Sequence, residues 1–316
     1  MDRTTPVSRT ADLGGPFSWV DHGGPADAPV VVAVHGLGGS HANWHDLAPL
    51  LTPTHRVLAV DLAGHGRTPR AGRSASVRAN AALLGRFVED VVAEPVVLLG
   101  NSMGGALSVL HAAAHPEQVR GLALVGPALP RARTDVPGRA LAKQVALFAV
   151  PGIAERSLAR RRSRLGSEAF VRATLELTCA DPSSVSQEMR QLDIALLDER
   201  ANGPDAEQAH LEAARSLAVF VTRAAAYRAM LASVTAPGIV LQGRLDRLVP
   251  VSGVAQLAEL QPDWTLHPLD GIGHVPQIEA PRLTADLLLP WLTSLSLENA
   301  PDLTGAGPTD LLAGAS

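Results

Sequence analysis

The sequence has little of what secreted or membrane-spanning proteins require. Its 316 residues include one cysteine, Cys179, so no disulfide can form within the chain. No stretch approaches the ~18 uninterrupted apolar residues of a membrane-spanning helix. Residues 1–15 are polar and lack the apolar segment of a signal peptide. We therefore expect a cytoplasmic protein that does not insert stably into membranes.

The chain also lacks a large excess of charge of either sign. The net charge is −4 and Lys143 is the only lysine, which gives no electrostatic reason to expect nucleic acid as a partner. No glycine-rich segment has the spacing of a nucleotide-binding loop. His41 and His45 have a four-residue spacing, but the glutamate of a zinc-hydrolase motif is missing. We expect neither a cofactor nor a metal, and the sequence does not indicate an oligomeric state.

Short apolar runs alternate with longer helical patterns along most of the chain. The runs are apolar nearly throughout, which is typical of parallel strands covered by helices on both faces. Helical spacing follows over residues 76–92, with Ser76 as N-cap, and over 103–114. This alternation predicts a doubly wound α/β fold with a mostly parallel central sheet. The predicted strands are 30–34, 56–60, 95–99, 122–125, 239–241 and 265–268.

One long segment, residues 131–234, interrupts this alternation and has only helical patterns. We interpret it as a helical insertion in a core domain formed by residues 15–130 and 235–296. Residues 1–14 and 297–316 are rich in small and polar residues, so we expect both tails to be poorly ordered. Large apolar side chains of the insertion are expected to fill its own core rather than contact a ligand; they are Phe148, Phe170, Phe220, Tyr227 and Met230.

The strongest chemical signal is the run Gly-Asn-Ser-Met-Gly at residues 100–104. A buried strand precedes it and a helix of small residues follows it, as in the G-x-S-x-G turn that exposes a nucleophilic serine. Such a turn holds Ser102 in strained backbone geometry, and glycines are needed where the helix and strand approach closely. The alternative is a glycine-rich turn with a capping serine. We predict that Ser102 is a nucleophile.

A second glycine-rich loop, His-Gly-Leu-Gly-Gly at residues 35–39, follows the strand at 30–34. A serine hydrolase needs two backbone N–H groups to stabilise an oxyanion, one from the residue after the nucleophile and one from such a loop. We assign these donors to Met103 and Leu37. His35 is interpreted as an orienting residue rather than the base.

An acid and a base follow the last two predicted strands. In chain order the residues are Ser102, Asp246 and His274, the order used by hydrolases of this architecture. His274 would take the proton of Ser102 and later return it to the leaving group. Asp246 would fix the imidazole tautomer and stabilise the imidazolium. Two other acids stay open as partners of the histidine, Asp270 and Asp135.

Five ordered pieces of the chain resemble the α/β-hydrolase superfamily over residues 17–295. The resemblance implies that residues 61–66 form a structural turn and that residues 131–234 form a cap over the site. Such a cap supplies the substrate pocket and excludes water. The five pieces are residues 35–38, 61–66, 100–104, 243–246 and 273–274.

The resemblance leaves the substrate open. We expect a carboxylesterase that acts on a small or medium, largely apolar acyl ester. The run at 100–105 is also similar to the nucleophile turn of the meta-cleavage-product hydrolases, which cut C–C bonds, but Val275 replaces the aromatic residue that usually follows their histidine. Haloalkane dehalogenases and epoxide hydrolases resemble the scaffold, yet they use aspartate in place of Ser102. A hydrolase-fold receptor with little turnover is a third alternative.

Overall fold

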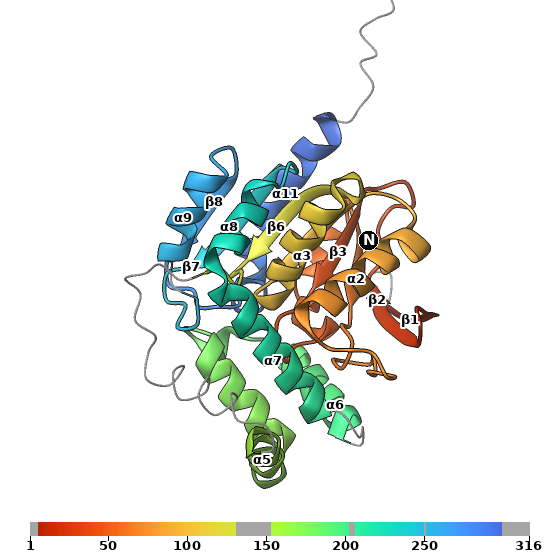
Figure 1. The fold of residues 1–316 in the computed structure, drawn as a ribbon, viewed down its shortest axis with the longest axis vertical. Helices are drawn as coiled ribbons and strands as arrows, with labels where there is room; N and C mark the ends of the chain where they lie inside the picture. Colours follow the sequence, from red (N-terminus) through yellow and green to blue (C-terminus); the bar gives the residue numbers. More distant parts are fainter. Residues whose placement is uncertain (1–5, 131–152, 202–205, 250, 299–316) are drawn as a thin grey trace, which may run out of the picture.

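The computed structural model describes residues 6–130, 153–201, 206–249 and 251–298. These residues contain an eight-stranded sheet with strand order β1-β2-β4-β3-β5-β6-β7-β8 (Figure 1). The strands β1 and β2 are antiparallel to their neighbours, and all other neighbours are parallel. The strands are β1 (Val7–Asp12), β2 (Pro16–Asp21), β3 (Val30–Val34), β4 (Arg56–Val60), β5 (Val96–Asn101), β6 (Val119–Val125), β7 (Gly238–Gly243) and β8 (Thr265–Leu269).

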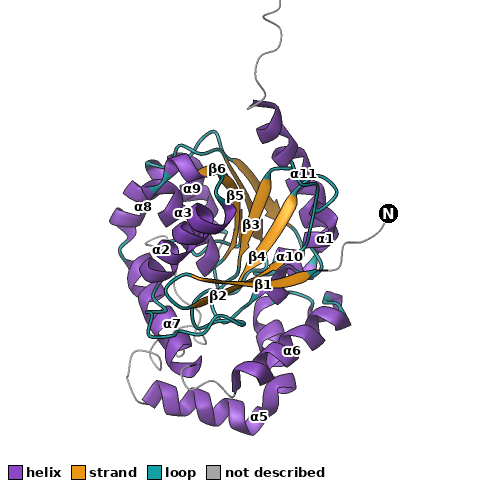
Figure 2. Ribbon diagram, turned by 90° about the vertical axis from the view of Figure 1, so that its right-hand side faces the viewer, coloured by secondary structure: helices purple, strands orange, loops and turns teal. Residues whose placement is uncertain are grey.

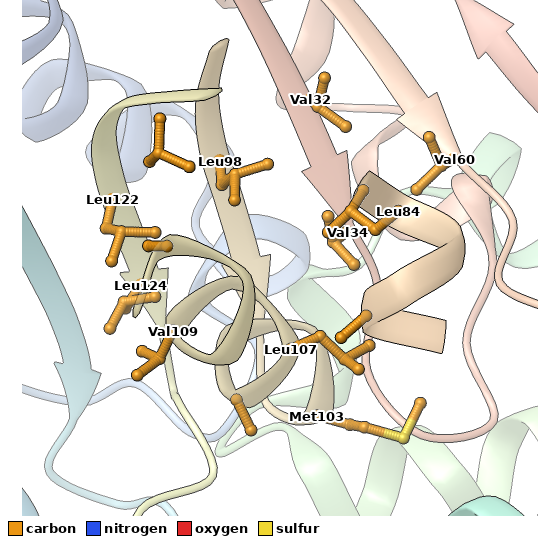
Figure 3. Close-up of a cluster of buried hydrophobic side chains, with 14 of the residues drawn as sticks. Val32, Val34, Val60, Leu84, Leu98, Met103, Leu107, Val109, Leu122 and Leu124 are labelled. Atoms are coloured by element: carbon orange, nitrogen blue, oxygen red, sulfur yellow. The ribbon is translucent and has the colours of Figure 1, made fainter. Parts of the chain in front are cut away.

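The central strands are apolar because helices cover both faces of the sheet (Figure 2). Alternate residues of β3 point to opposite sides: Val32 and Val34 join one buried cluster, and Val31 and Ala33 join another. The first cluster packs under four helices, and Figure 3 shows part of it. These helices are α2 (Val77–Phe87), α3 (Met103–Ala114), α8 (Ala224–Ala232) and α9 (Ser252–Leu260). The second cluster lies under α1 (Ala48–Leu51) and α11 (Pro281–Glu298).

The predicted core elements are present in the structure. β3 and β4 have the predicted bounds, and β5 to β8 are one to three residues longer than predicted. Helix α2 begins after Ser76, whose hydroxyl accepts a hydrogen bond from the Ala79 amide, and it continues into a short π-helix, η2 (Val88–Val92). A strand that is buried on both faces can therefore be recognised from the sequence, but the residue at which it ends cannot be predicted as well.

The N-terminal segment departs from the sequence prediction. Residues 1–14 were expected to be poorly ordered, but Val7–Asp12 form β1, which pairs with β2 along its whole length. The Arg9 guanidinium donates to Asp21, and the hydroxyls of Thr10 and Ser18 are hydrogen-bonded. Because β1 lies at the sheet edge and is almost entirely exposed, it has no apolar pattern to reveal it. At the other end, α11 extends to Glu298, two residues into the predicted tail.

The predicted insertion is helical where it is described. It contains α5 (Ile153–Thr178), interrupted at Gly166, then α6 (Gln187–Ala201) and α7 (Ala206–Thr222). These helices lie at one end of the molecule, below the sheet in Figure 1. The predicted end at residue 234 is too late, because α8 packs against α3 and buries Tyr227 and Leu231 in the sheet-covering layer. The short helices are η1 (His41–Trp44), η3 (Pro116–Gln118), η4 (Pro182–Ser184) and α10 (Pro276–Glu279).

The large apolar side chains of the insertion do not share one core. Tyr227 is fully buried against the α2–α3 layer, with Phe220 in edge-on contact at 5.1 Å and Met230 packed beside them. Helix α8 carries Tyr227 and Met230 back to the sheet, so the expectation of a separate cap core is wrong for these residues. Phe148 lies outside the described residues. No helix in the described part of the chain combines the length and apolarity needed to cross a membrane.

Candidate active site

The turn after β5 places Ser102 at the carboxyl edge of the sheet. Ser102 has φ 52° and ψ −114°, a backbone conformation that side chains rarely adopt, and it is half-buried at the N-terminus of α3. The glycines on either side allow this geometry. A Cβ at Gly104 would lie 2.1 Å from the Val34 carbonyl oxygen, and one at Gly100 would lie 2.7 Å from the backbone of Gly104. The backbone therefore presents the Ser102 hydroxyl at a strained, tightly packed turn.

The predicted acid and base are in direct contact. His274 Nδ1 donates to Asp246 Oδ2 at 2.7 Å, and both side chains are almost completely buried. Burial raises the pKa of Asp246, but the charge and hydrogen bond of His274 and two backbone N–H groups outweigh it, so the pKa lies below its ordinary value. Asp246 is therefore a carboxylate at neutral pH and holds the Nδ1–H tautomer of His274, which leaves Nε2 free to accept a proton.

The loop after β3 lies against the serine turn. A Cβ at Gly36 would approach the Ser102 Cβ to 3.1 Å, so the two turns are in van der Waals contact. His35 is fully buried: its Nδ1 donates to the Gly36 carbonyl at 2.7 Å, and its Nε2 accepts from the Leu62 amide at 3.1 Å. Burial lowers the pKa of His35 to about 4, so the ring is neutral. His35 thus orients the loop, as its position after the strand suggested.

The assignment of the Leu37 and Met103 amides as oxyanion donors stays a prediction. Within the described residues, no group accepts a hydrogen bond from the Leu37 or Met103 amide. None of these residues accepts one from the Ser102 hydroxyl either, so Ser102 and His274 are not hydrogen-bonded here. The nucleophile–base bond of a hydrolase commonly tightens only when substrate is present.

Of the two rival acids, Asp270 is described and does not contact His274. The Asp270 side chain is 92% exposed and forms an ion pair with Arg244 at 2.8 Å. Asp135 lies outside the described residues. Asp61, from the turn expected to be structural, accepts hydrogen bonds from His41 Nδ1 at 2.9 Å and from the Arg67 amide at 2.9 Å. These hydrogen bonds use the Asp61 carboxylate to hold the turn together.

A pocket is formed between Gly38, in the loop after β3, and side chains of the insertion. Phe170 lies in its wall. Arg200 donates to the Gly64 carbonyl at 2.7 Å, and burial lowers the pKa of nearby His210 to about 4. The wall is therefore less apolar than the sequence suggested. Its residues are Gly38, Phe170, Leu197, Arg200, Ala206, Glu207 and His210.

Sequence reasoning missed two polar residues next to the histidine loop. Asn101 Nδ2 donates to the Val125 carbonyl at 2.8 Å and to the His274 carbonyl at 3.3 Å, which links the serine turn to the base. Glu279 accepts hydrogen bonds from backbone amides on two segments. The position of Asn101 beside the serine was a usable signal, but nothing local marks Glu279.

Comparison with known proteins agrees with this architecture. A family model described as "alpha/beta hydrolase fold" matches residues 29–281. The chain is 29% identical to a 2-hydroxy-6-oxononadienedioate/2-hydroxy-6-oxononatrienedioate hydrolase of Cupriavidus pinatubonensis, covering 80% of this chain and 83% of that protein. It is also 29% identical to a pimeloyl-[acyl-carrier protein] methyl ester esterase of Aeromonas hydrophila, covering 82% and 94% of the two chains.

A similar solved structure is the haloalkane dehalogenase DbeA from Bradyrhizobium elkani. Its TM-score is 0.78 at 25% identity, and the match covers 93% of this chain and 99% of that one. The fold is therefore shared over nearly the whole length of both proteins. Because the family match spans most of the sequence and includes every strand from β3 to β8, this chain belongs to the α/β-hydrolase family of enzymes.

Proposed function

We propose that the protein is a serine hydrolase that cleaves carboxylic esters through an acyl-enzyme intermediate. The observation that carries the proposal is the buried 2.7 Å bond between Asp246 and His274, at the same sheet edge as the strained turn of Ser102. A histidine with its Nδ1 proton committed to a carboxylate is prepared to accept a proton at Nε2.

The reaction would proceed in two halves. Ser102 Oγ attacks the acyl carbon while its proton passes to His274 Nε2, and the amides of Leu37 and Met103 stabilise the negative charge on the carbonyl oxygen. The tetrahedral intermediate expels the alcohol, which takes the proton from His274. Water then attacks the acyl-serine by the same route in reverse, and it releases the acid and restores Ser102. Asp246 stays ionised throughout.

The substrate we propose is an ester with a small to medium acyl group. The similarity to the methyl ester esterase of A. hydrophila supports ester cleavage. The wall beside the loop after β3 combines Phe170 and Leu197 with the basic side chain of Arg200 and the acidic side chain of Glu207, so it offers both apolar surface and polar groups. This mixture suits a substrate that is mostly apolar but carries a polar substituent.

C–C bond hydrolysis is the second candidate. The similarity to the C. pinatubonensis hydrolase and the Asn101-Ser102-Met103 run favour it. However, Val275 is a buried residue packed with Ile278 and Cys179, and it supplies no aromatic ring beside His274. For this reason we place ester hydrolysis first.

Turnover of p-nitrophenyl butyrate by the wild type and by Ser102→Ala tests the proposal. We expect steady hydrolysis by the wild type and a loss of at least about 10⁴-fold in the variant. Loss of the visible absorbance of a ring-fission product, with no ester turnover, would instead favour C–C hydrolysis. A ligand-induced thermal shift without any product would favour a receptor. If the wild type turned over no ester, thioester or lactone, the proposal would be wrong.

A further inference from the structure

Glu279 is a buried carboxylate that lies outside the proposed catalytic set. It ends α10 and is 6% exposed. One oxygen, Oε2, accepts a hydrogen bond from the Gly273 amide at 2.8 Å, and the other, Oε1, accepts one from the Asp181 amide at 2.8 Å. Gly273 directly precedes His274, and Asp181 follows helix α5 of the insertion. A single carboxylate thus bridges the histidine loop and a segment 98 positions away.

The same two segments also meet without Glu279. We call residues 178–181, which follow the end of α5, the cap corner. The His274 amide donates to the Thr178 carbonyl of the cap corner at 2.7 Å. A Cβ at Gly273 would lie 2.4 Å from that carbonyl oxygen and 2.7 Å from the Ala180 nitrogen. Backbone therefore packs directly on backbone here, and glycine is the one residue that fits.

The bridge leaves the backbone around His274 with little freedom. The His274 amide donates a hydrogen bond to the cap corner, and the His274 carbonyl accepts one from Asn101. The imidazole ring of His274 is hydrogen-bonded to Asp246. The Ile272–Gly273 peptide before it is held at both ends: the Ile272 carbonyl accepts a hydrogen bond from the Leu245 amide at 3.0 Å, and the Gly273 amide donates to Glu279 of the bridge. Bonds from an amide to a carboxylate are about twice as strong as bonds between neutral groups. Removing the carboxylate would leave the buried Gly273 N–H and the partly buried Asp181 N–H without this acceptor.

We propose that Glu279 is a positioning residue for His274. It fixes the peptide that precedes the base and ties it to the cap corner, so the imidazole keeps its place between Asp246 and the serine turn. The inference rests on the proposed serine-hydrolase function. It adds that the cap corner is part of the framework of the base and not only a cover over the substrate.

The test compares Glu279→Gln with a matched control, Glu212→Gln. Glutamine retains one acceptor oxygen but turns an NH₂ group toward the other backbone amide, so one of the two bonds is lost. Glu212 of α7 also joins an inserted helix to the core, through Ser74 and Arg70, but it does not touch the histidine loop. All proteins are assayed on p-nitrophenyl butyrate at a temperature where circular dichroism shows them fully folded.

We expect Glu279→Gln to lower kcat by about tenfold to a hundredfold with KM within about threefold, because a displacement near 1 Å can cost about 10²-fold. The control should stay within about twofold of wild type in both constants. Glu279→Asp keeps the charge but is one methylene too short to reach both amides. It should lower kcat in the same direction, and it serves if the glutamine variant does not fold.

A second readout does not depend on the substrate. The Nδ1–H proton of His274, bonded to a buried carboxylate, should give a slowly exchanging downfield ¹H NMR signal in wild type and in the Glu212 variant. We expect this signal to broaden or vanish in the Glu279 variants. Folded Glu279 variants with wild-type kcat and an unchanged signal, even if they melt earlier, would overturn the inference. If the wild type hydrolyses no ester, the proposed function fails, but the NMR comparison still tests the positioning role.

Discussion

Replacing Asp246 by asparagine separates the role of its charge from the role of its shape. All four hydrogen bonds that its carboxylate accepts are defined. Oδ1 accepts the amides of Leu248 at 2.7 Å and Val249 at 2.9 Å. Oδ2 accepts His274 Nδ1 at 2.7 Å and Gln242 Nε2 at 2.8 Å. Asparagine has a single acceptor oxygen, so its NH₂ group must replace one of the two carboxylate oxygens.

The structure decides which oxygen is replaced. An NH₂ group at the Oδ1 position would face the two backbone donors, and each unpaired donor costs about 1–3 kcal/mol. At the Oδ2 position, the NH₂ group can donate to Nδ1 of His274, whose proton then moves to Nε2. Gln242 loses its hydrogen bond to residue 246, but without flipping its Nε2 keeps the other one, to the Val249 carbonyl at 3.0 Å. The fold survives, but the histidine carries the wrong tautomer for a base.

We therefore expect Asp246→Asn to lower kcat by about 10⁴-fold, or about 5.5 kcal/mol, with little change in melting temperature. The assay is p-nitrophenyl ester hydrolysis, with thermal unfolding as a check on the fold. Asp270→Asn is the control: it removes an exposed acid four residues from His274 that binds only Arg244 among the described residues, and it should change kcat by less than about twofold. An Asp246→Asn enzyme that keeps more than about a tenth of wild-type kcat would refute the reasoning.

Three other results are expected. Ser102→Gly should raise the free energy of unfolding by about 1–2 kcal/mol in urea titrations, because glycine adopts φ 52° without strain, and an unchanged or lower value would count against strain at this turn. The folded-state pKa of His35 is about 4, so its stabilising contribution is complete above about pH 6.5 and falls by about 1.4 kcal/mol per unit below it. The unfolding free energy of His35→Gln should therefore depend less on pH between 6.5 and 5 than that of wild type, and equal slopes would contradict this. Burial raises the pKa of Cys179 to about 12, so the native protein should not react with Ellman's reagent at pH 8 until it is unfolded; rapid labelling of native protein would show that the thiol is accessible.

The sheet could be predicted because its strands are buried on both faces. The valine-rich run at 30–34 and the run at 56–60 have no polar residue on the inner faces, and both became strands with the predicted bounds. The role of the glycines around Ser102 could also be predicted, since each glycine avoids a specific clash with a backbone carbonyl. Local patterns were sufficient where one segment alone determines the conformation.

Features that depend on distant partners could not be predicted. The strand β1 is exposed and exists because β2 offers it an edge, so its residues show no periodicity. Helix α8 resembles the helices of the insertion in composition, and only its contact with α3 assigns it to the core. Glu279 takes its role from Asp181, far away in the sequence. The charged wall near Arg200 likewise forms only when the insertion folds over the loop after β3.

The most direct test of the central claim is to identify the residue that becomes covalently modified. The protein is incubated with alkyl fluorophosphonates of increasing chain length, and the adduct is located by peptide mass spectrometry. We predict stoichiometric modification of Ser102 alone, abolished in Ser102→Ala and strongly slowed in Asp246→Asn, with the fastest labelling by short or medium chains. Labelling of a different residue, or undiminished labelling of the Ser102→Ala protein, would contradict the assignment of Ser102 as the nucleophile.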